Sequence, residues 1–159
     1  MKKANIGISE KNKKAIADLL SQVLADEFVL YAKTLNTHWN VEGPDFHPVH
    51  LYLETLYIQQ QKIVDTVAEK IRTLGHYAPA TLTDYLERTQ LSDKAPAKND
   101  SQSIFAALLK DHESIIVSLR EKIDTTSEDL KADGISDYLT GLMEQHEKTA
   151  WMLRAHLVK

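Results

Sequence analysis

Residues 28–57 read FVLYAKTLNTHWNVEGPDFHPVHLYLETLY and predict the end of one long helix, a sharp break and the start of a second helix. Before the break, apolar residues recur every three or four positions, as on the buried face of an amphipathic helix: Ile16, Leu19, Leu20, Val23, Leu24, Phe28, Tyr31 and Leu35. Ser9 is a good N-cap, so we expect this first helix to run from Ser9 to His38. Gly43 and Pro44 then break the helical pattern.

A second helix is expected to follow Asp45, which can cap it. Pro48 is tolerated because the amides of a first helical turn need no intrahelical partner. The helix should end at Gly75, and its buried stripe consists of Val49, Leu53, Leu56, Tyr57, Val64, Val67, Ile71 and Leu74. From Gly75 to Asp100 the helical period lapses, and this long connection carries only a short helical patch at about residues 83–88.

Two further helices complete the pattern. The third starts at Asp100 or Ser101 and has a stripe of Phe105, Leu108, Leu109, Ile115, Ile116, Leu119 and Ile123. The fourth starts at Asp133 and has a stripe of Leu139, Leu142, Met143, Leu153 and Leu157. Four long amphipathic helices with one long connection predict an all-α four-helix bundle whose crossover carries a short helix.

Length and composition exclude several classes of protein. The chain has 159 residues, about one domain's worth, so we expect a single domain over residues 1–159 that includes a short N-terminal tail at residues 1–8. Only 5 Gly and 4 Pro argue against turn-dense sandwiches and barrels. The absence of Cys excludes disulfide scaffolds, thiolate nucleophiles and cysteine-ligated metal sites, so any metal must be bound by His, Asp or Glu.

Charge is unevenly distributed along the chain. The net charge is −4, yet residues 1–14 hold five Lys and one Glu, which leaves −8 on the remainder. Such a basic end is either a nucleic-acid tail or the solvated start of a helix. No apolar run has the length of a signal-peptide core or of a membrane span, so we expect a cytoplasmic protein.

A second stripe lies beside the apolar stripe of the second predicted helix. At 100° per residue, an arc of about 100° holds acids, an imidazole and apolar residues together: His50, Leu51, Glu54, Ile58, Asp65 and Glu69. The apolar members indicate a face that is buried against something else. Carboxylates on a buried face require a cation, and a donor set of His, Asp and Glu suits Fe, Mn or Zn.

A simpler interpretation of the two later acids stays open. Asp65 and Glu69 are one turn apart and would pair with Lys62 and Arg72 as exposed residues, because helices tolerate such acids easily.

The axial rise of the helix limits which residues can bind the same metal ion. Fifteen residues on one helix separate His50 from Asp65 by about 22 Å, so the two cannot share one metal ion within a chain. Either each chain has two half-sites, or two antiparallel copies of the helix join them across a two-fold axis.

His38 continues the buried stripe of the first helix and precedes the break that leads into His50. A lone His in such a position is usually a core residue with a hydrogen-bond partner, and the neighbouring Trp39 is equally ordinary as core. His38, His50 and Glu54 nevertheless converge at one end of the second helix, with Asp65 nearer the other end.

The residues that form this constellation match a known family pattern. Residues 38–50 read HWNVEGPDFHPVH, and they are followed by Glu54 and by Asp65-x-x-x-Glu69. The stretch resembles the Dps family, the DNA-binding proteins from starved cells or mini-ferritins. The pattern of that family is HWN-x-x-GP-x-F, a second His twelve residues after the first, and D-x-x-x-E fifteen residues later. Residues 147–155, EKTAWMLRA, are also similar to the family's last helix, so the resemblance covers nearly the whole chain.

The resemblance implies a ferritin-like bundle that assembles into a hollow shell of twelve subunits, with ferroxidase sites at the two-fold interfaces. His38, His50 and Glu54 would come from one subunit, and Asp65 and Glu69 from its neighbour, which agrees with the separation of about 22 Å. The implied activity is oxidation of Fe(II), preferably by hydrogen peroxide, followed by storage of ferric mineral. Zn or Mn are substitutes that the same ligands would accept.

The resemblance also bears on residues around the site. Trp39 would either pack against the site or donate electrons. Family members have acidic pores through which iron enters, and the acids at this point of the sequence are Glu128, Asp129, Asp133 and Asp137. Helix capping and solvated loop charge explain these four acids equally well. His47 lies near the ligand arc as a candidate accessory ligand.

DNA binding is where the sequence departs from many family members. They use a longer, Lys-rich tail, whereas here only about eight residues with Lys2 and Lys3 precede the first helix. Twelve copies would multiply the weak electrostatic attraction of each tail, so DNA is still an expected partner and association with the nucleoid is still expected.

Two rival functions predict different sequence features. A larger ferritin or di-iron carboxylate bundle would carry Glu-x-x-His motifs within one subunit, and no His here has Glu three residues before it. A metal-free helical nucleoid or interaction protein would use the arc only as a dimer interface. His112 and His146 fall on the apolar stripes of the last two helices, where we expect core or hydrogen-bonded roles.

Overall fold

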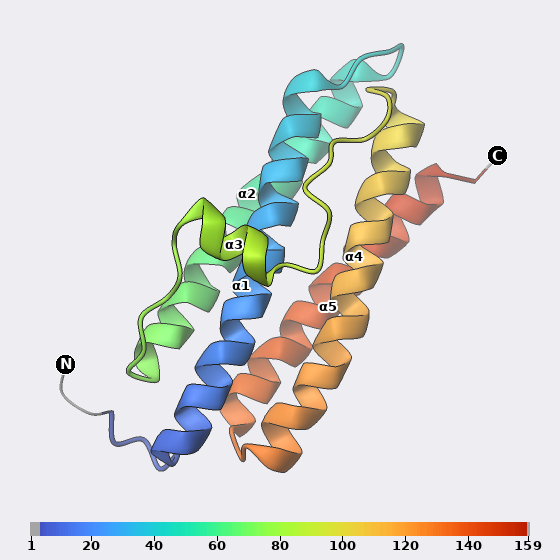
Figure 1. Cartoon of the computed structure of the whole chain (residues 1–159). Helices are drawn as coiled ribbons and strands as arrows, with labels where there is room; N and C mark the ends of the chain where they lie inside the picture. Colours follow the sequence, from blue (N-terminus) through green and yellow to red (C-terminus); the bar gives the residue numbers. More distant parts are fainter. Residues whose placement is uncertain (1–3, 159) are drawn as a thin grey trace.

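The computed structural model describes residues 4–158 and contains six helical segments in that part of the chain. In chain order these are α1 (Glu10–Asn40), α2 (Phe46–Thr73), α3 (Leu82–Arg88), α4 (Ser101–Asp124), the π-helical turn η1 (Thr125–Asp129) and α5 (Asp133–His156). The four long helices lie side by side, and the crossover with α3 runs along the outside of α1 (Figure 1). α1 and α5 point one way and α2 and α4 the other, which confirms the predicted all-α bundle.

Most helix ends lie where the sequence predicted them. Ser9 accepts a hydrogen bond from the Asn12 N–H at 3.2 Å, and Asp100 accepts one from the Ser103 N–H at 2.9 Å. Each cap satisfies an amide that has no partner inside its helix. Gly75 follows α2 with a φ of +90°, a left-handed conformation that glycine adopts most readily.

The turn between α1 and α2 differs from its prediction in two respects. α1 extends past His38 to Asn40, because the helical hydrogen bonds continue until the Val41 N–H reaches Thr37 O at 2.9 Å. Asp45 precedes α2, but its side chain forms no cap hydrogen bond, so the predicted capping role was wrong. A side-chain cap commonly reaches the third amide of its helix, and that residue is Pro48, which has no N–H.

Hydrogen bonds to one buried carboxylate of α1 hold the crossover in place. Asp26 accepts hydrogen bonds from the Thr89 hydroxyl at 2.8 Å, the Gln90 backbone N–H at 2.8 Å and the Gln90 side-chain amide at 3.2 Å. α3 itself starts one residue before the predicted patch. Thr81 and Asp84 cap it reciprocally, which fixes the start at Leu82.

The turn between α4 and α5 carries a feature that the sequence did not predict. After Asp124 the chain continues into the π-helical turn η1, in which the Leu130 N–H bonds to Thr125 O at 3.1 Å. Lys131 then adopts a φ of +53°, which reverses the chain into α5. α5 begins at Asp133, as predicted.

The core lies between the four long helices and consists mainly of Leu, Ile and Val side chains from all of them. The α1–α2 and α4–α5 pairs pack most extensively, so the molecule is two helical hairpins laid against each other. Buried apolar area of this kind contributes about 25 cal/mol per Å² and is the main term that holds the bundle together. Within residues 4–158, no helix is both long enough and apolar enough to cross a membrane.

Candidate metal centre

Two imidazole rings stack against each other where α1 turns into α2. His38 is buried near the end of α1, His50 is half-buried in α2, and their ring centroids are 3.8 Å apart. Each ring bonds to the other residue's backbone: His38 Nδ1 lies 3.0 Å from His50 O, and His50 Nδ1 lies 2.9 Å from His38 O. The predicted convergence of the two histidines is therefore present within one chain.

These hydrogen bonds decide which ring nitrogen can bind a metal. A backbone carbonyl only accepts, so the Nδ1 atom of each ring must carry the proton. The Nε2 atom of each neutral imidazole then has a free lone pair, which is the form that binds a metal ion. Phe46 and Tyr57 hold the rings in place, with centroids 5.1 Å from His50 and 5.0 Å from His38, respectively.

Glu54 lies one helical turn after His50 on α2 and is half-buried. One-turn spacing puts two side chains on the same face of a helix, where they can reach a common ion. The set from one chain is nevertheless incomplete. Among residues 4–158, no group of three or more His, Asp or Glu side chains is placed to hold a metal ion.

Asp65 and Glu69 lie farther along α2 and are not brought to the histidines. α2 is one continuous helix over Phe46–Thr73, so His50 and Asp65 are separated by about 22 Å along its axis. Both acids are exposed, and within the described residues neither forms an ion pair, so the predicted alternative of pairing with Lys62 and Arg72 is not observed. Two carboxylates one turn apart and without a cation are available to an outside partner.

Comparison with known proteins identifies the family of this chain. A family model described as a ferritin-like domain matches residues 17–159. DNA protection during starvation protein 2 of Bacillus anthracis is 35% identical over 146 residues, which cover 91% of this chain and 97% of that protein. This chain belongs to the Dps family.

Solved Dps structures share the whole fold. DpsC from Streptomyces coelicolor superposes with a TM-score of 0.94 at 28% identity, covering 99% of this chain and 92% of that one. The Dps protein of Vibrio cholerae O1, described as a member of a broad superfamily of ferritin-like diiron-carboxylate proteins, gives a TM-score of 0.92 at 26% identity, with 99% and 98% covered. The predicted ferritin-like bundle is thereby confirmed.

The face of α2 that carries the candidate ligands is apolar and uncovered in the single Dps-family chain. Leu51 and Ile58 are 45% and 42% exposed, and Trp39 is 67% exposed beside the histidines. Trp39 therefore does not pack in the core of its own subunit, so the core interpretation of Trp39 is wrong, whereas its role at the metal site stays a prediction. An open groove adjoins Asp65 on the same face, lined by Ile58, Gln61, Lys62, Val64 and Ala68.

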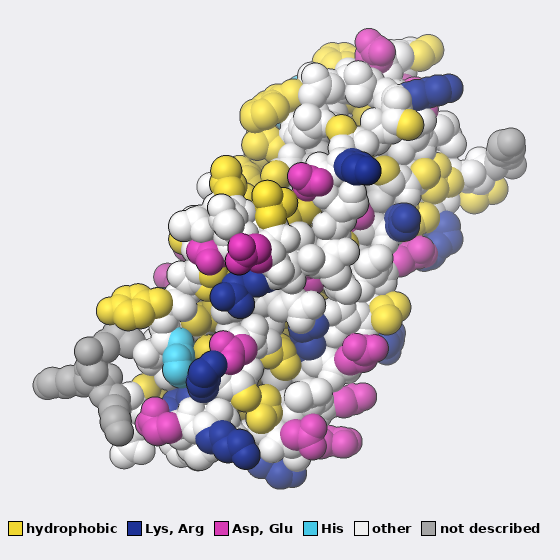
Figure 2. Space-filling model, viewed as in Figure 1, with side chains coloured by type: hydrophobic (Ala, Val, Ile, Leu, Met, Phe, Trp, Pro, Cys, Tyr) yellow, Lys and Arg dark blue, Asp and Glu magenta, His cyan; other side chains and the backbone are white. Residues whose placement is uncertain are grey.

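A second apolar surface lies at the crossover. Hydrophobic side chains gather beside α3 in Figure 2, around a groove of about 290 Å³ between α1 and α3. Leu82 and Leu86 of α3 project at its edge and are both exposed. Exposed apolar patches of this kind commonly mark interaction sites on soluble proteins.

The remaining predicted site residues lie on the surface. Acidic side chains occur around η1 and the start of α5, and all four predicted pore acids are exposed: Glu128, Asp129, Asp133 and Asp137. None of them supplies a side-chain cap to α5, because its N-cap is Ala132. His47 is exposed next to the turn, and Lys2 and Lys3 lie outside the described residues.

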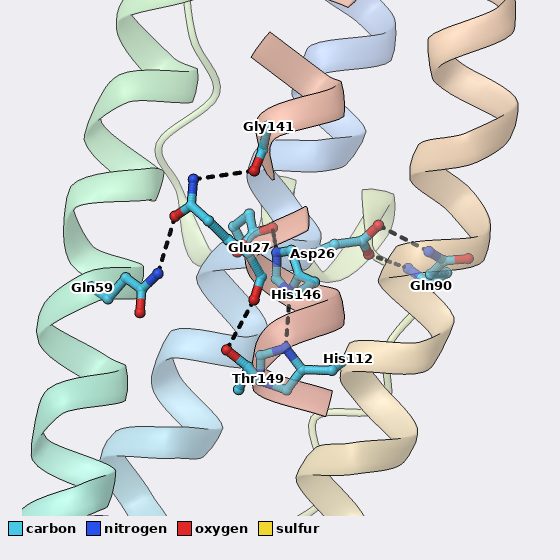
Figure 3. A network of polar contacts seen from close by, with 9 residues as sticks. Asp26, Glu27, Gln59, Gln90, His112, Gly141, His146 and Thr149 are labelled. Carbon is cyan, nitrogen blue, oxygen red and sulfur yellow. Dashed lines mark hydrogen bonds and ion pairs between the residues drawn. The ribbon is translucent and has the colours of Figure 1, made fainter. Parts of the chain in front are cut away.

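Sequence reasoning missed a polar network in the middle of the bundle. His112 and His146 are buried and hydrogen bonded, as predicted, but they also contact each other, and His146 bonds to the buried Glu27 (Figure 3). Burial holds the pKa of His112 well below its usual range, with the neighbouring His146 as a second cause. A second buried pair, Lys33 with Asp111, joins α1 to α4.

Proposed function

We propose that this Dps-family chain is a ferroxidase that oxidises Fe(II) at sites between subunits and stores the ferric product as mineral inside a hollow shell. The observation that carries the proposal is the stacked pair of His38 and His50, whose mutual Nδ1–H bonds leave both Nε2 atoms free. Such bonds fix the tautomer of a ligating His and raise its basicity. Membership of the ferritin-like superfamily supports the same activity.

The site is completed by a second subunit. His38, His50 and Glu54 of one subunit form one half, and Asp65 and Glu69 of the neighbouring subunit form the other. A two-fold axis that sets two copies of α2 antiparallel brings the two halves together twice, so each dimer contains two equivalent sites. The uncovered Leu51 and Ile58 supply the apolar contact that such an interface needs.

Imidazole and carboxylate donors suit Fe(II) as the substrate, and they also accept Zn or Mn. The carboxylates favour the product, because the extra positive charge of Fe(III) is stabilised by anionic oxygens. Hydrogen peroxide is the proposed oxidant: two Fe(II) ions give up one electron each, and one peroxide molecule takes both electrons and two protons to become two water molecules. Trp39 is exposed beside the histidines in one chain. In the assembled shell we expect it either to pack against the metal site or to supply electrons to it.

The proposed shell is a dodecamer of this chain located in the cytoplasm. Its acidic pore for incoming iron would be formed by the exposed acids near η1 and the start of α5: Glu128, Asp129, Asp133 and Asp137. DNA is a further proposed partner, because twelve copies would multiply the weak electrostatic attraction of each basic N-terminal segment. The described part of the N-terminal segment is held against α1 by the Lys13 ammonium group, which donates to Ala4 O.

The experiment measures both subunit assembly and iron oxidation. Light scattering coupled to size exclusion is run beside anaerobic Fe(II) loading and hydrogen peroxide addition, on wild type, Asp65→Ala and the control Asp18→Ala, an exposed acid on α1. We expect a particle of about twelve subunits that oxidises iron rapidly, slows strongly in Asp65→Ala and is unchanged in Asp18→Ala. A monomer or dimer with no oxidation above buffer would leave a metal-free helical interaction protein instead.

A further inference from the structure

A row of aromatic rings leads away from the stacked histidines between α1 and α2. The ring of Tyr57, on α2, meets the ring of His38 edge to face, with 5.0 Å between the centroids. Tyr31, on α1, meets Tyr57 in the same manner at 6.5 Å. Both separations lie in the range that aromatic side chains prefer when they pack together. His38, Tyr57 and Tyr31 therefore form one continuous series of ring contacts that begins at a candidate iron ligand.

Helical geometry explains why two tyrosines lie on this path. Tyr31 precedes His38 by seven residues on α1, and Tyr57 follows His50 by seven residues on α2. Seven residues make about two turns, so each tyrosine lies on the same face of its helix as its histidine. Side chains tilt toward the N-terminus of their helix. His38 therefore leans away from the turn between α1 and α2 and Tyr57 leans toward it, which brings the two rings together.

The chemistry of the rings decides which of them can donate an electron. A phenol that loses an electron also releases its hydroxyl proton, and Tyr31 and Tyr57 are only half-buried, so that proton can pass to water. The ring of Phe28 lies 6.1 Å beyond Tyr31, but Phe has no hydroxyl proton to release, so the series of donors ends at Tyr31. Trp39 is 67% exposed, and within residues 4–158 its indole is in ring contact with neither histidine.

The proposed iron site gives a reason for such a donor. Ferritin-like di-iron bundles hold two ions with four Glu and two His side chains. The proposed site has one carboxylate fewer, so its second ion is held more weakly, and a site that receives little iron holds a single ion. Its ligands are His38, His50 and Glu54 of one subunit with Asp65 and Glu69 of the next.

A single Fe(II) ion is hazardous in the presence of hydrogen peroxide. Peroxide needs two electrons to become water, and one Fe(II) ion gives up only one. Without a second electron, peroxide splits into hydroxide and a free hydroxyl radical. A side chain that supplies the second electron at the site prevents that release.

We propose that Tyr57 supplies the second electron to hydrogen peroxide, through His38, when a site holds only one Fe(II) ion, and that Tyr31 then reduces the Tyr57 radical. The inference rests on the ferroxidase proposed above. In the first step the Fe(II) ion and the Tyr57 phenol lose one electron each. The phenol proton and one proton from water are taken up by peroxide, which gives two water molecules, Fe(III) and a neutral tyrosyl radical.

The radical then moves away from the iron and is repaired. Tyr31 passes one electron to the Tyr57 radical and releases its proton to water, while Tyr57 takes up a proton and becomes a phenol again. A later Fe(II) ion is oxidised to Fe(III), and its electron, together with a proton from water, restores Tyr31. The sum is two Fe(II) ions for each peroxide, the same ratio as when both ions are bound at once.

The test compares wild type with Tyr57→Phe, which keeps the ring that packs against His38 and removes only the hydroxyl group. Anaerobic protein receives less than one Fe(II) ion per site and then hydrogen peroxide, and is frozen for electron paramagnetic resonance. We expect a tyrosyl radical in wild type, its loss in Tyr57→Phe and a matching rise in hydroxyl radical captured by a spin trap. Tyrosine deuterated on the ring should narrow the signal, which distinguishes it from a radical on Trp39.

Tyr52→Phe is a matched control on the same helix. Tyr52 is half-buried two residues after His50, but its ring packs against Phe105 and His156. Burial raises the pKa of Tyr52, so its phenol holds its proton more firmly. This variant should give the radical and spin-trap signals of wild type. Tyr31→Phe should still form the radical but lose it faster, because the second donor is missing.

Two results would overturn the proposal while leaving the ferroxidase intact. The first is wild type that oxidises iron without a tyrosyl radical. The second is a radical that survives in Tyr57→Phe and is lost in Trp39→Phe, which would assign the electron to Trp39. Equal radical lifetimes in wild type and Tyr31→Phe would refute the second step. Wild type that oxidises no iron, whether Fe(II) is limiting or in excess, would refute the ferroxidase and this inference together.

Discussion

Ile58→Lys tests whether the apolar face of α2 is buried between subunits. Ile58 is 42% exposed in the single chain and lies on the same face as the candidate ligands His50 and Asp65. If a second copy covers this face, the remaining exposed part of Ile58 leaves water when the dimer forms. A lysine at this position would place a charge in the interface.

The size of the effect follows from the exposed fraction. Full burial of an Ile side chain is worth about 1.5–3 kcal/mol, so covering the 42% that is exposed is worth about 0.6–1.3 kcal/mol. A two-fold interface contains the residue twice, so its loss costs about 1.3–2.5 kcal/mol per dimer. That corresponds to a dimer dissociation constant raised roughly 10- to 70-fold, before the desolvation of the new ammonium group is added.

The assay is analytical ultracentrifugation over a range of protein concentrations, with iron oxidation measured on the same samples. Ile58→Lys should dissociate and lose iron oxidation together, because each site needs two subunits. Ile58→Leu keeps the apolar volume and should behave like wild type. Val117→Lys, at an exposed apolar residue of α4, controls for an added surface charge. Unchanged assembly of Ile58→Lys would refute the assignment of this face to a subunit interface.

Three further substitutions test the fold. Asp26→Ala leaves the Gln90 backbone N–H without its acceptor and should lower the free energy of unfolding in urea by about 1–3 kcal/mol; unchanged amide exchange at Gln90 would contradict the role of Asp26. Burial lowers the pKa of Lys122 from its usual 10.5, so folding favours the neutral amine. The unfolding free energy of wild type should therefore rise relative to Lys122→Met as pH increases from neutrality toward 10.5. Parallel pH profiles of the two proteins would contradict a lowered pKa of Lys122 in the folded state. Gly75→Ala would place a Cβ in ordinary contact with Ala4 Cβ at 3.8 Å but requires a φ of +90°, so it should cost about 1–2 kcal/mol by thermal unfolding, and an unshifted Tm would argue against that conformation.

The sequence predicts most of the fold because the signals involved are local. Helix ends at Ser9, Gly75 and Asp100 depend on a residue and its immediate neighbours, and the structure has all three. Asp45 failed as a cap because the residue that normally supplies the bonded amide is Pro48. The π-helical turn η1 could not be predicted, because residues 125–129 are polar and carry no apolar period.

The candidate site was predictable in part for the same reason. His38 and His50 are each six residues from Pro44, so a tight turn between two helices brings them together. His112 and His146 have the equivalent relation, each seventeen residues from Asp129 in the turn between α4 and α5. That symmetry is a usable signal in a predicted helical hairpin.

The sequence does not reveal that Glu27 joins His112 and His146, nor which hydrogen bonds these three residues form. Glu27 comes from another helix, 119 residues before His146, and no spacing rule links them. Within residues 4–158, the side-chain amide of the buried Gln60 has no hydrogen-bond partner, and this depends on side-chain packing across four helices, which a helical period does not specify.

Subunit complementation tests the shared site most directly. His50→Ala and Asp65→Ala are prepared as separate inactive proteins, unfolded, mixed in equal amounts and reassembled. In a mixed dimer one site combines both defects, and the other has an intact His50 from one subunit and an intact Asp65 from its partner. Random mixing makes half of the dimers mixed, so about a quarter of wild-type iron oxidation should return. Mixtures that stay as inactive as either parent would contradict a site built from two subunits.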